Sequence, residues 1–597
     1  MRAFRALRSS PPKLSHRHLS TKLSYFSGPK EPVLLHQTVG SHLADITALH
    51  GDRTAVVSYH QKSRLTYEEL HARSTELAHG LARYGVKKGD RVAVSLGNGI
   101  EYAVATYALF KLGAVLVPLN TNFNSNQITA AINHLDVSHL IISTEANLPR
   151  KAPRSNIPIL TELVPNLANG SASEILPSLK GIIAVDNSAG RFNGEYKGLD
   201  WYNDLAADGA SVRKPLVAEL DPDEVVNIQF TSGTTSVPKA ACLTHTSILN
   251  NGKSIGDRML LTENDSICCP PPFFHCFGCV LGYLACMTHG SAIVLPAESF
   301  NAEATVFAVR DEKCTGLHGV PTMFIQILEL LEEGVVNADA FKYLRTGIAA
   351  GSSVPSELMK KLHQKLNLTE LTICYGMTET APVSCMTTTN DPLIKRLDSV
   401  GRLLPHVEAK VVDPLDKSRI IPIGEKGELA VTGYNLMTGY WNDVERTAEA
   451  MIADKEGKVW MHTGDEAEMD EAGYVKITGR IKELIIRGGE NIHPLEIENC
   501  LLAHPEIAEV SVVGLKDAKY GEVVAAFVRM ADHHEGLTED KVRLWVREKL
   551  SSHLVPAYIF WTTDFPKTAS GKIQKFKLQE LGNELRAASD AAKSASP

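Results

Sequence analysis

The chain has 597 residues, of which 44% are apolar and 22% are charged, and its formal net charge is -8. This length is too great for one hydrophobic core, so we expect a globular protein with two or more domains. The weak acidic charge argues against nucleic acid as a partner, no uncharged run reaches the roughly 20 residues of a transmembrane segment, and ten cysteines are too few for a disulfide scaffold.

The first thirty residues differ in composition from the rest of the chain. They contain several serines, no aspartate or glutamate, and seven basic residues: Arg2, Arg5, Arg8, Lys13, Arg17, Lys22 and Lys30. This composition is typical of a mitochondrial presequence, and a disordered basic tail is the alternative. We therefore predict a targeting presequence over 1–30 and a mitochondrial location, with peroxisomal or cytoplasmic locations as alternatives.

The following segment predicts helices that alternate with strands. Thr66 and Glu69 have the spacing of a capping box, and the apolar face that follows them stops at Gly85. Residues 102–119 are interpreted as a buried helix that runs into a strand, because Lys111 and Gly113 interrupt the apolar run. Further strands are predicted at 91–96, 182–185, 292–295 and 371–374. Short spacing between helices and strands favours an α/β sheet covered by helices.

A polar loop follows the apolar run 225–229. It reads Phe230-Thr231-Ser232-Gly233-Thr234-Thr235-Ser236-Val237-Pro238-Lys239-Ala240 and contains five hydroxyl side chains, one glycine and one lysine. A strand that ends in such a loop directs N–H groups, hydroxyls and an ammonium toward one point, which favours a phosphate site. The alternative is a polar surface turn, and the spacing is not that of the common P-loop.

Four later segments could complete a nucleotide site, although each has an ordinary structural alternative. Residues 375–380 offer a ring that can stack on a purine, a hydroxyl, and a carboxylate that can hold Mg²⁺, or they are a plain helix start. Asp465 follows Gly464 on a tight turn and could accept ribose hydroxyls. Residues 479–492 form a charged strand with a glycine pair, and 566–575 contain three lysines.

The pattern changes after about residue 480. Helices are predicted at 494–503 and 538–550, and strands at 508–513, 523–529 and 559–561. These elements would make a small α+β domain of roughly 100 residues with its boundary near Lys482. The alanine- and serine-rich end of the chain is predicted to be disordered.

The order and spacing of these motifs resemble the adenylate-forming superfamily over roughly residues 35–583. Residues 227–230, 272–276, 487–492 and 570–577 look most like the mitochondrial medium-chain acyl-CoA synthetases of the acyl-CoA synthetase family member 2 branch. Fungal-type ligases that activate hydroxy or branched acids for secondary metabolism look similar. The resemblance implies an α/β fold: a large multi-sheet AMP-binding domain at 31–481, a small mobile α+β lid domain at 482–583, and a disordered tail at 584–597.

The resemblance also implies a two-step ligase reaction. A carboxylic acid, expected to be a medium-chain fatty acid, attacks the α-phosphate of ATP with Mg²⁺ present, and pyrophosphate leaves. The thiol of coenzyme A then attacks the acyl-adenylate and releases AMP. Rival functions are an enzyme that loads the acyl group onto a carrier protein and a nucleotide-binding regulator without catalysis. Oligomeric state is not predicted.

Residue roles follow from the resemblance, position by position. Thr231 to Lys239 would hold the β- and γ-phosphates, Thr378 the α-phosphate, Glu379 the Mg²⁺ ion, and Lys572 both the carboxylate and the α-phosphate. Gly351, Ser352, Ser353 and Tyr375 would hold adenine, while Asp465 and Arg480 would hold ribose. Lys482 would be the hinge, and Gly489 would face the coenzyme A tunnel. The acyl pocket would involve His275, Phe277, Met323, Gly351, Tyr375, Gly376, Met377 and Pro382.

The phosphate loop departs from the family pattern at two positions. Ser236 and Ala240 stand where the family usually has glycine. Glycine at such a loop commonly supplies a positive φ or a close backbone approach, so we expect a differently placed or strained loop that binds ATP more weakly. A Cys-x-x-Cys beside His275 is interpreted as part of the acyl pocket, with metal binding as the alternative.

Overall fold

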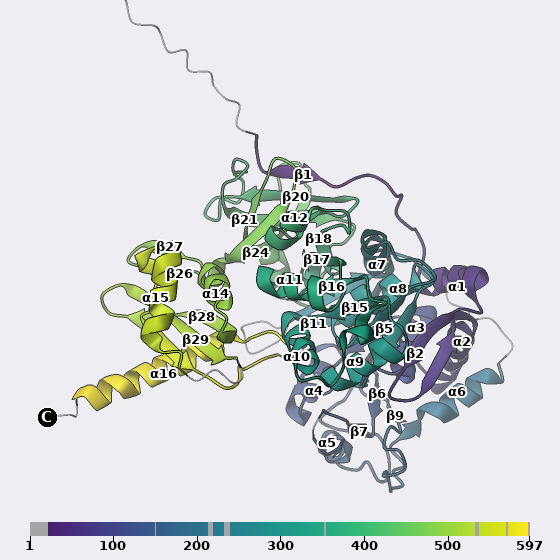
Figure 1. The fold of residues 1–597 in the computed structure, drawn as a ribbon. Coiled ribbons are helices and arrows are strands. Elements are labelled where there is room, and N and C mark those ends of the chain that lie inside the picture. The colour runs from purple at the N-terminus through teal and green to yellow at the C-terminus, as the bar shows by residue number, and fades with distance from the viewer. Residues whose placement is uncertain are drawn as a thin grey trace, which may run out of the picture.

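The computed structural model describes residues 22–149, 151–212, 216, 219–231, 239–351, 354–531, 536–568 and 571–594. A large N-terminal domain and a small C-terminal domain lie side by side (Figure 1). The predicted boundary at Lys482 falls in the short helix η4 (Ile481–Glu483), between the last strand of the large domain and the first strand of the small one. The predicted α/β class with a small second domain is confirmed.

Two sheets form most of the large domain. Within the described residues, the first has the order β10 (Asp200–Trp201), β9 (Gly181–Val185), β6 (His139–Ser143), β4 (Arg91–Ser95), β5 (Val115–Pro118), β11 (Val225–Thr231), β12 (Lys239–Thr244), β22 (Gly439–Tyr440). The second has the order β19 (Arg402–Leu403), β18 (Val383–Met386), β17 (Glu370–Gly376), β16 (Thr346–Ala349), β15 (Gly316–Gly319), β13 (Ser266–Cys268), β14 (Ala292–Leu295), β2 (Thr54–Ser58), β3 (Ser63–Thr66). The central strands of both sheets run parallel and are buried on both faces, as their continuous apolar sequences predict.

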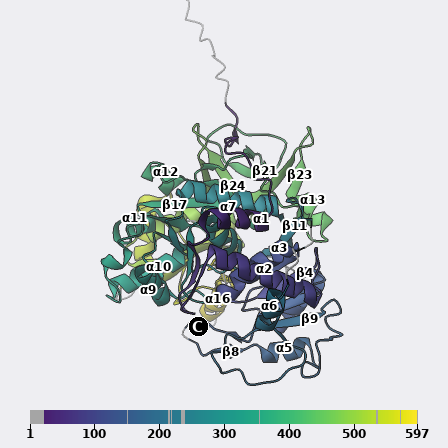
Figure 2. The same cartoon turned by 90° about the vertical axis from the view of Figure 1, so that its right-hand side faces the viewer.

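A third sheet closes one end of the large domain, opposite the β9 edge of the first sheet (Figure 1, Figure 2). It contains β1 (Tyr25–Ser27), β20 (Val407–Val412), β21 (Gly427–Gly433), β24 (Val459–Met469), β23 (Met451–Ala453) and β25 (Val475–Arg480), while β7 (Glu145–Ala146) and β8 (Arg154–Ser155) pair separately. The small domain has its own sheet of β27 (Glu490–Ile492), β26 (Ile485–Arg487), β29 (Gly521–Met530), β28 (Ile507–Asp517) and β30 (Tyr558–Trp561). Each domain thus has a separate core.

Helices cover these sheets. In the large domain they are α1 (Val39–His50), α2 (Tyr67–Tyr84), α3 (Ile100–Leu112), α4 (Ser125–His134), α5 (Ile157–Leu163), α6 (Tyr202–Ala210), α7 (His245–Met259), the π-helix η1 (Phe277–Leu284), α8 (Ala285–Met287), α9 (Ala302–Asp311), α10 (Pro321–Glu332), η2 (Ala338–Phe341), α11 (Ser356–Lys365), η3 (Thr378–Thr380), α12 (Leu393–Asp398) and α13 (Val444–Ala450). The small domain has α14 (Pro494–Leu502), α15 (Glu539–Lys549), η5 (Ser552–Leu554) and α16 (Lys575–Ser594).

Local signals in the sequence placed several of these elements correctly. The Thr66 hydroxyl accepts the Glu69 N–H at 3.1 Å, and the Glu69 carboxylate accepts the Thr66 N–H at 2.9 Å, so the predicted capping box starts α2. Helix α3 is buried except at Glu101 and Lys111, and it leads into β5 as predicted. A helix that is apolar on all sides belongs in a core, which is where the structure places it.

Two predicted chain ends are wrong. Tyr25 to Ser27 pair with Lys410 to Glu408 of β20, so the folded domain begins before residue 30 and a presequence could not extend through β1. Residues 584–594 continue helix α16 instead of being disordered. Arg586 holds this part of the helix through an ion pair with Asp517 at 3.1 Å, and alanine-rich sequence favours helix once such a contact exists.

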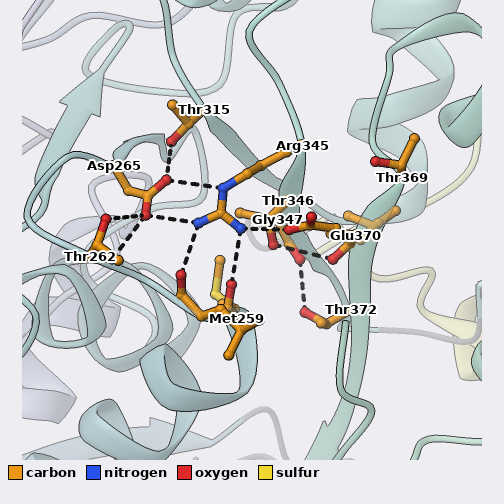
Figure 3. A network of polar contacts seen from close by, with 12 residues as sticks. Met259, Thr262, Asp265, Thr315, Arg345, Thr346, Gly347, Thr369, Glu370 and Thr372 are labelled. Carbon is orange, nitrogen blue, oxygen red and sulfur yellow. Dashed lines mark hydrogen bonds and ion pairs between the residues drawn. The ribbon is translucent and has the colours of Figure 1, made fainter. Parts of the chain in front are cut away.

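Arg345 joins the amino ends of four strands in the second sheet (Figure 3). Its guanidinium donates to Asp265 at 2.8 Å, to Glu370 at 2.6 Å and to the carbonyl of Leu260 at 2.9 Å. Asp265 also accepts from Thr315 at 2.7 Å. These four side chains precede or begin β13, β15, β16 and β17. Burial alone would raise the pKa of Asp265, but the hydrogen bonds from Thr315 and Arg345 outweigh burial and hold it below its ordinary value.

We expect Arg345→Met to lower the free energy of unfolding by about 2 to 3 kcal/mol, because it leaves the Asp265 carboxylate buried without its cation. The control Arg310→Met removes an exposed ion pair with Asp311 and should cost less than about 1 kcal/mol. Because the folded-state pKa of Asp265 is lowered, its contribution is full above about pH 4 and is lost as the pH falls below that value. Urea unfolding at several pH values measures both effects, and equal losses in the two variants would contradict the expectation.

Candidate active site

The carboxyl ends of parallel strands bring the predicted site residues together. Strands β15, β16 and β17 are in register and end at Gly319, Ala349 and Gly376. Gly351 follows β16 with φ +94°, and Tyr375 lies near the end of β17. In open α/β sheets, ligands bind outside this edge.

The predicted phosphate loop joins β11 to β12. Thr231 and Lys239 are paired residues at its two ends and are half-buried. The residues between them, and two predicted adenine contacts, lie outside the described residues: Ser232, Gly233, Thr234, Thr235, Ser236, Val237, Pro238, Ser352 and Ser353. The prediction of backbone strain at Ala240 is wrong, because Ala240 lies within β12, pairs with Phe230 and has no positive φ. A regular strand conformation is open to any L-residue, so glycine is not required there.

Asp465 connects two other predicted nucleotide contacts. The Tyr375 hydroxyl donates to one carboxylate oxygen at 2.6 Å, and the Arg480 Nε atom lies 3.3 Å from the other. Asp465 lies in β24 and Arg480 in the paired strand β25, where the two residues are register partners. Burial raises the pKa of Asp465, and Arg480 and Tyr375 oppose that rise. The three side chains therefore form one cluster, whereas the sequence predicted each of them as a separate nucleotide contact.

Glu379 lies in η3, and the structure adds a partner that the sequence analysis missed. Tyr440 in β22 donates its hydroxyl to the Glu379 carboxylate at 2.7 Å, and the Lys239 ammonium lies 4.8 Å from the centre of the Tyr440 ring. Both Glu379 and Tyr440 are buried. The Gly439-Tyr440-Trp441 triplet carries no local signal of chemistry, so only the three-dimensional arrangement reveals this link between the phosphate loop and the predicted metal ligand.

Lys572 reaches into the large domain from the small one. It lines a small cavity together with Pro271, Pro272, His275, Phe277, Val320 and Gly351. Burial lowers the pKa of Lys572, and burial together with the nearby Lys572 charge lowers the pKa of His275 to about 3. His275 is therefore a neutral ring, whose Nδ1 accepts the N–H of Phe277 at 3.2 Å.

The thiol of Cys276 follows His275 in the chain and contacts another predicted site residue. The Cys276 sulfur lies 3.8 Å from the Thr378 hydroxyl, which places the predicted α-phosphate contact beside the same cavity. Burial raises the pKa of Cys276 to about 11, so it is a neutral thiol.

The residues predicted for the acyl pocket and the coenzyme A tunnel lie in different places. His275, Phe277 and Gly351 line the cavity, whereas Met323 is buried in the core at the start of α10. The backbones of Gly376 and Pro382 lie so close that a Cβ on Gly376 would be 1.8 Å from the Pro382 carbonyl oxygen, so this position has no room for a side chain. Met377 packs partly buried against the core. Gly489, with φ +90°, lies in the β26–β27 turn and is not among the residues that line the cavity.

The small domain docks through the loop that carries Lys572. Gly571 has φ +85°, and a Cβ there would lie 3.0 Å from Val320 and 3.3 Å from the Thr322 hydroxyl. Outside this loop, Arg529 of β29 and Glu329 of α10 approach to 3.8 Å. No helix in the described part of the chain is long and apolar enough to cross a membrane.

Similarity to known proteins matches this architecture. A family model for AMP-binding enzymes matches residues 43–441, and the model for the AMP-binding enzyme C-terminal domain matches 496–572. The acyl-CoA ligase sidI of Beauveria bassiana is 44% identical over 575 residues, covering 94% of this chain and 95% of that protein. The mitochondrial medium-chain acyl-CoA ligase ACSF2 of Mus musculus is 35% identical over 576 residues, covering 94% and 89%. A crystal structure of the anthranilate CoA ligase AuaEII in complex with anthranoyl-AMP shares the fold with a TM-score of 0.78 at 21% identity, covering 93% and 98%.

We expect Gly571→Ala to loosen the docked loop, because the new methyl group would press on Val320 in addition to straining the backbone. Gly457→Ala is a matched control: Gly457 has φ +83° but no atom within 4 Å of its Cβ position. Both changes should cost about 1 to 2 kcal/mol of stability through the positive φ. Only Gly571→Ala should raise amide hydrogen exchange at the start of α10, and equal exchange in both variants would contradict this assignment.

Proposed function

We propose that this chain joins a carboxylic acid to AMP in the cavity at Lys572. The chain belongs to the AMP-binding enzyme family and is an acyl-CoA synthetase. The acid oxygen would attack the α-phosphate of ATP, pyrophosphate would leave, and the coenzyme A thiol would then replace AMP on the acyl group. One observation carries this proposal: Lys572 of the small domain meets His275, Phe277 and Gly351 of the large domain in one cavity.

Electrostatics would supply most of the rate. Both the acid and the attacked phosphate are anionic, so a positioned cation between them lowers the repulsion as they approach. Burial lowers the pKa of Lys572 in the free protein, and two anionic ligands would favour its charged form again. In a dry cavity this interaction is stronger than in water. Thr378, beside Cys276, would donate to the same phosphate.

The nucleotide would be held by groups on either side of Lys572. Thr231 and Lys239 at the ends of the phosphate loop would hold the β- and γ-phosphates together with the residues between them. Tyr375 and Gly351 would hold adenine, and the Asp465 carboxylate would accept from the ribose hydroxyls, with Arg480 beside it. Among the described residues, the buried Asp465 carboxylate has two partners, which leaves acceptor capacity for hydroxyl groups.

Glu379 fits a Mg²⁺ ion that travels with ATP. Its carboxylate is buried, Tyr440 occupies one oxygen, and the other has no partner among the described residues. Mg²⁺ in nucleotide enzymes commonly uses one or two protein carboxylates together with water and phosphate oxygens. When bound, the ion would neutralise charge on the phosphates during transfer.

The second half-reaction would require Lys572 to leave the cavity. We propose that η4 with Lys482 is the hinge, because it is the short connection between the two cores. Rotation there would remove Lys572 and bring another face of the small domain, with Gly489, to the site for coenzyme A.

We expect Lys572→Ala to lower acyl-adenylate formation by at least about 100-fold, which corresponds to about 2.7 kcal/mol. Thioester formation from a supplied acyl-adenylate and coenzyme A should change little, because Lys572 has no role in that step. Pyrophosphate release measures the first half-reaction, and chromatography of acyl-CoA measures the second. Equal loss of both would contradict the role of Lys572, and pyrophosphate release by the wild type without acyl-CoA would favour transfer to a carrier protein.

The substrate class is drawn from two observations. Identity to the Beauveria bassiana acyl-CoA ligase, at 44%, exceeds that to the Mus musculus medium-chain enzyme, at 35%. We therefore propose the alternative from the sequence, a hydroxy or branched acid, and place an unsubstituted medium-chain acid second. We propose that the Tyr102 hydroxyl would meet such a substituent. Tyr102 of α3 is 1% exposed, its hydroxyl has no hydrogen-bond partner among the described residues, and its ring lies 5.4 Å from that of Phe273, next to the cavity-lining Pro272.

We expect Tyr102→Phe to lower kcat/KM for a hydroxylated acid by about 10-fold, the value of one lost hydrogen bond of about 1.4 kcal/mol. Activity toward the unsubstituted acid of the same length should not fall. Tyr67→Phe is the control, because the Tyr67 hydroxyl is also buried but donates to the Ser291 carbonyl at 2.7 Å. Acyl-CoA formation across paired acids from four to twelve carbons measures this, and preference for the unsubstituted acids would favour the medium-chain alternative.

We also propose a mitochondrial location. The support is the basic, acid-free composition before β1 and the mitochondrial relative. The folded domain includes β1, so the targeting segment would end before Tyr25.

A further inference from the structure

We infer that Tyr440 is a positioning residue that couples the phosphate loop to the Mg²⁺ ligand. This inference rests on the proposed roles of Glu379 and Lys239. The hydroxyl of Tyr440 would fix the orientation of the Glu379 carboxylate, and its ring would fix the Lys239 ammonium. One side chain would thus set the distance between the metal and the triphosphate.

The backbone around Tyr440 joins the two elements that it would couple. Gly439 and Tyr440 pair with Cys242 and Ala241 of β12, the strand that begins at Lys239. Three residues earlier, the Met437 N–H donates to the Glu379 carbonyl at 2.9 Å. The segment 437–441 therefore connects the phosphate-loop strand to η3 through main-chain hydrogen bonds, and Tyr440 adds a side-chain connection in the same place.

Tyr440 is itself held in place by helix α13. Its N–H donates to the Thr447 hydroxyl at 2.9 Å in α13. Gly439 has φ +148°, and a Cβ there would lie 3.2 Å from the Thr447 methyl group. Since Tyr440 is 6% exposed and anchored to a helix, its ring has little freedom to move. A rigid group that contacts Lys239 can order that residue instead of moving with it.

The hydrogen bond from Tyr440 to Glu379 suits a residue that orients a metal ligand. The Tyr440 hydroxyl is the donor of this hydrogen bond and the Glu379 carboxylate is the acceptor. It binds one oxygen of Glu379 and leaves the other for a ligand. Partners that hydrogen-bond a ligating carboxylate fix its orientation, and their loss commonly costs 10- to 100-fold in metal affinity. The ring below Lys239 adds a cation–π interaction.

Two substitutions separate the two contacts. Tyr440→Phe keeps the ring under Lys239 and removes the hydrogen bond to Glu379, while Tyr440→Leu removes both. Tyr474→Phe is the matched control, because it removes another tyrosine–carboxylate hydrogen bond, of 2.8 Å to Asp391, from a different part of the large domain. Glu379→Gln tests the proposed metal ligand independently.

The first readout is Mn²⁺ binding, which electron paramagnetic resonance measures. The protein is loaded with an ATP analogue whose α,β-bridge is methylene and cannot be cleaved. We expect Tyr440→Phe to weaken Mn²⁺ binding by about 10-fold without changing the affinity for the metal-free analogue. Tyr440→Leu should weaken the binding of both, and Tyr474→Phe neither. Adenylation measured against Mg²⁺ concentration should shift in the same order.

The outcomes distinguish this inference from the proposed function. If Glu379→Gln binds Mn²⁺ as well as the wild type, the metal role proposed for Glu379 is wrong. If Glu379→Gln loses Mn²⁺ but Tyr440→Phe retains wild-type affinity, the inference about Tyr440 is overturned while the proposed function stands. A Tyr440→Phe variant that only melts at a lower temperature, with unchanged Mn²⁺ binding, would show a structural role alone.

Discussion

The parallel register of β15, β16 and β17 is the constraint on which the candidate site depends. Register partners Gly316, Thr346 and Glu370 lie side by side at the amino ends of these strands, where Arg345 joins them to β13 and to the end of α7. Because the strands start level, their opposite ends place Val320, Gly351 and Tyr375 at one edge. A slip of one residue would turn the side chains of that strand to the other face. The half-buried Arg345 network therefore lies at the opposite ends of these strands from the candidate site, yet it joins the strands whose register places that site.

The site concentrates ionisable groups in a region with little water. Glu379 and Asp465 are buried, Lys572 is half-buried, and the neutral His275 ring lines the same cavity as Lys572. Burying such charges costs free energy unless a partner compensates for it, and Tyr440 and Arg480 compensate only in part. The uncompensated remainder is what an anionic nucleotide and its cation would satisfy. The buried charges would thus lower the stability of the free protein and raise its affinity for the charged ligand.

Local features of the sequence predicted more than long-range contacts. The capping box of α2, the buried α3 and the motif strands depend on neighbours within a few residues, so the sequence alone was sufficient. Strand β1 was missed because its partner in β20 is nearly 400 residues away, and the α16 extension was missed because Asp517 anchors it from another strand. Tyr440 was missed for the same reason: its meaning lies in Lys239 and Glu379, which precede it by 201 and 61 residues respectively. Ala240 shows the converse error, in which a family pattern suggested strain that a regular strand does not have.

The contact between the domains is suited to being made and broken. It includes Gly571 against Val320 and Thr322, a 3.2 Å approach between the His493 ring and Glu466, and a 3.8 Å approach between Arg529 and Glu329. Polar contacts of this kind are weak compared with a hydrophobic core, so relative movement of the domains is the default expectation. Within the small domain, by contrast, Lys567 of the same loop binds the buried Glu509 at 2.9 Å. Lys567 therefore ties its end of the loop to the small domain, which would let Lys572 enter and leave the cavity together with that domain.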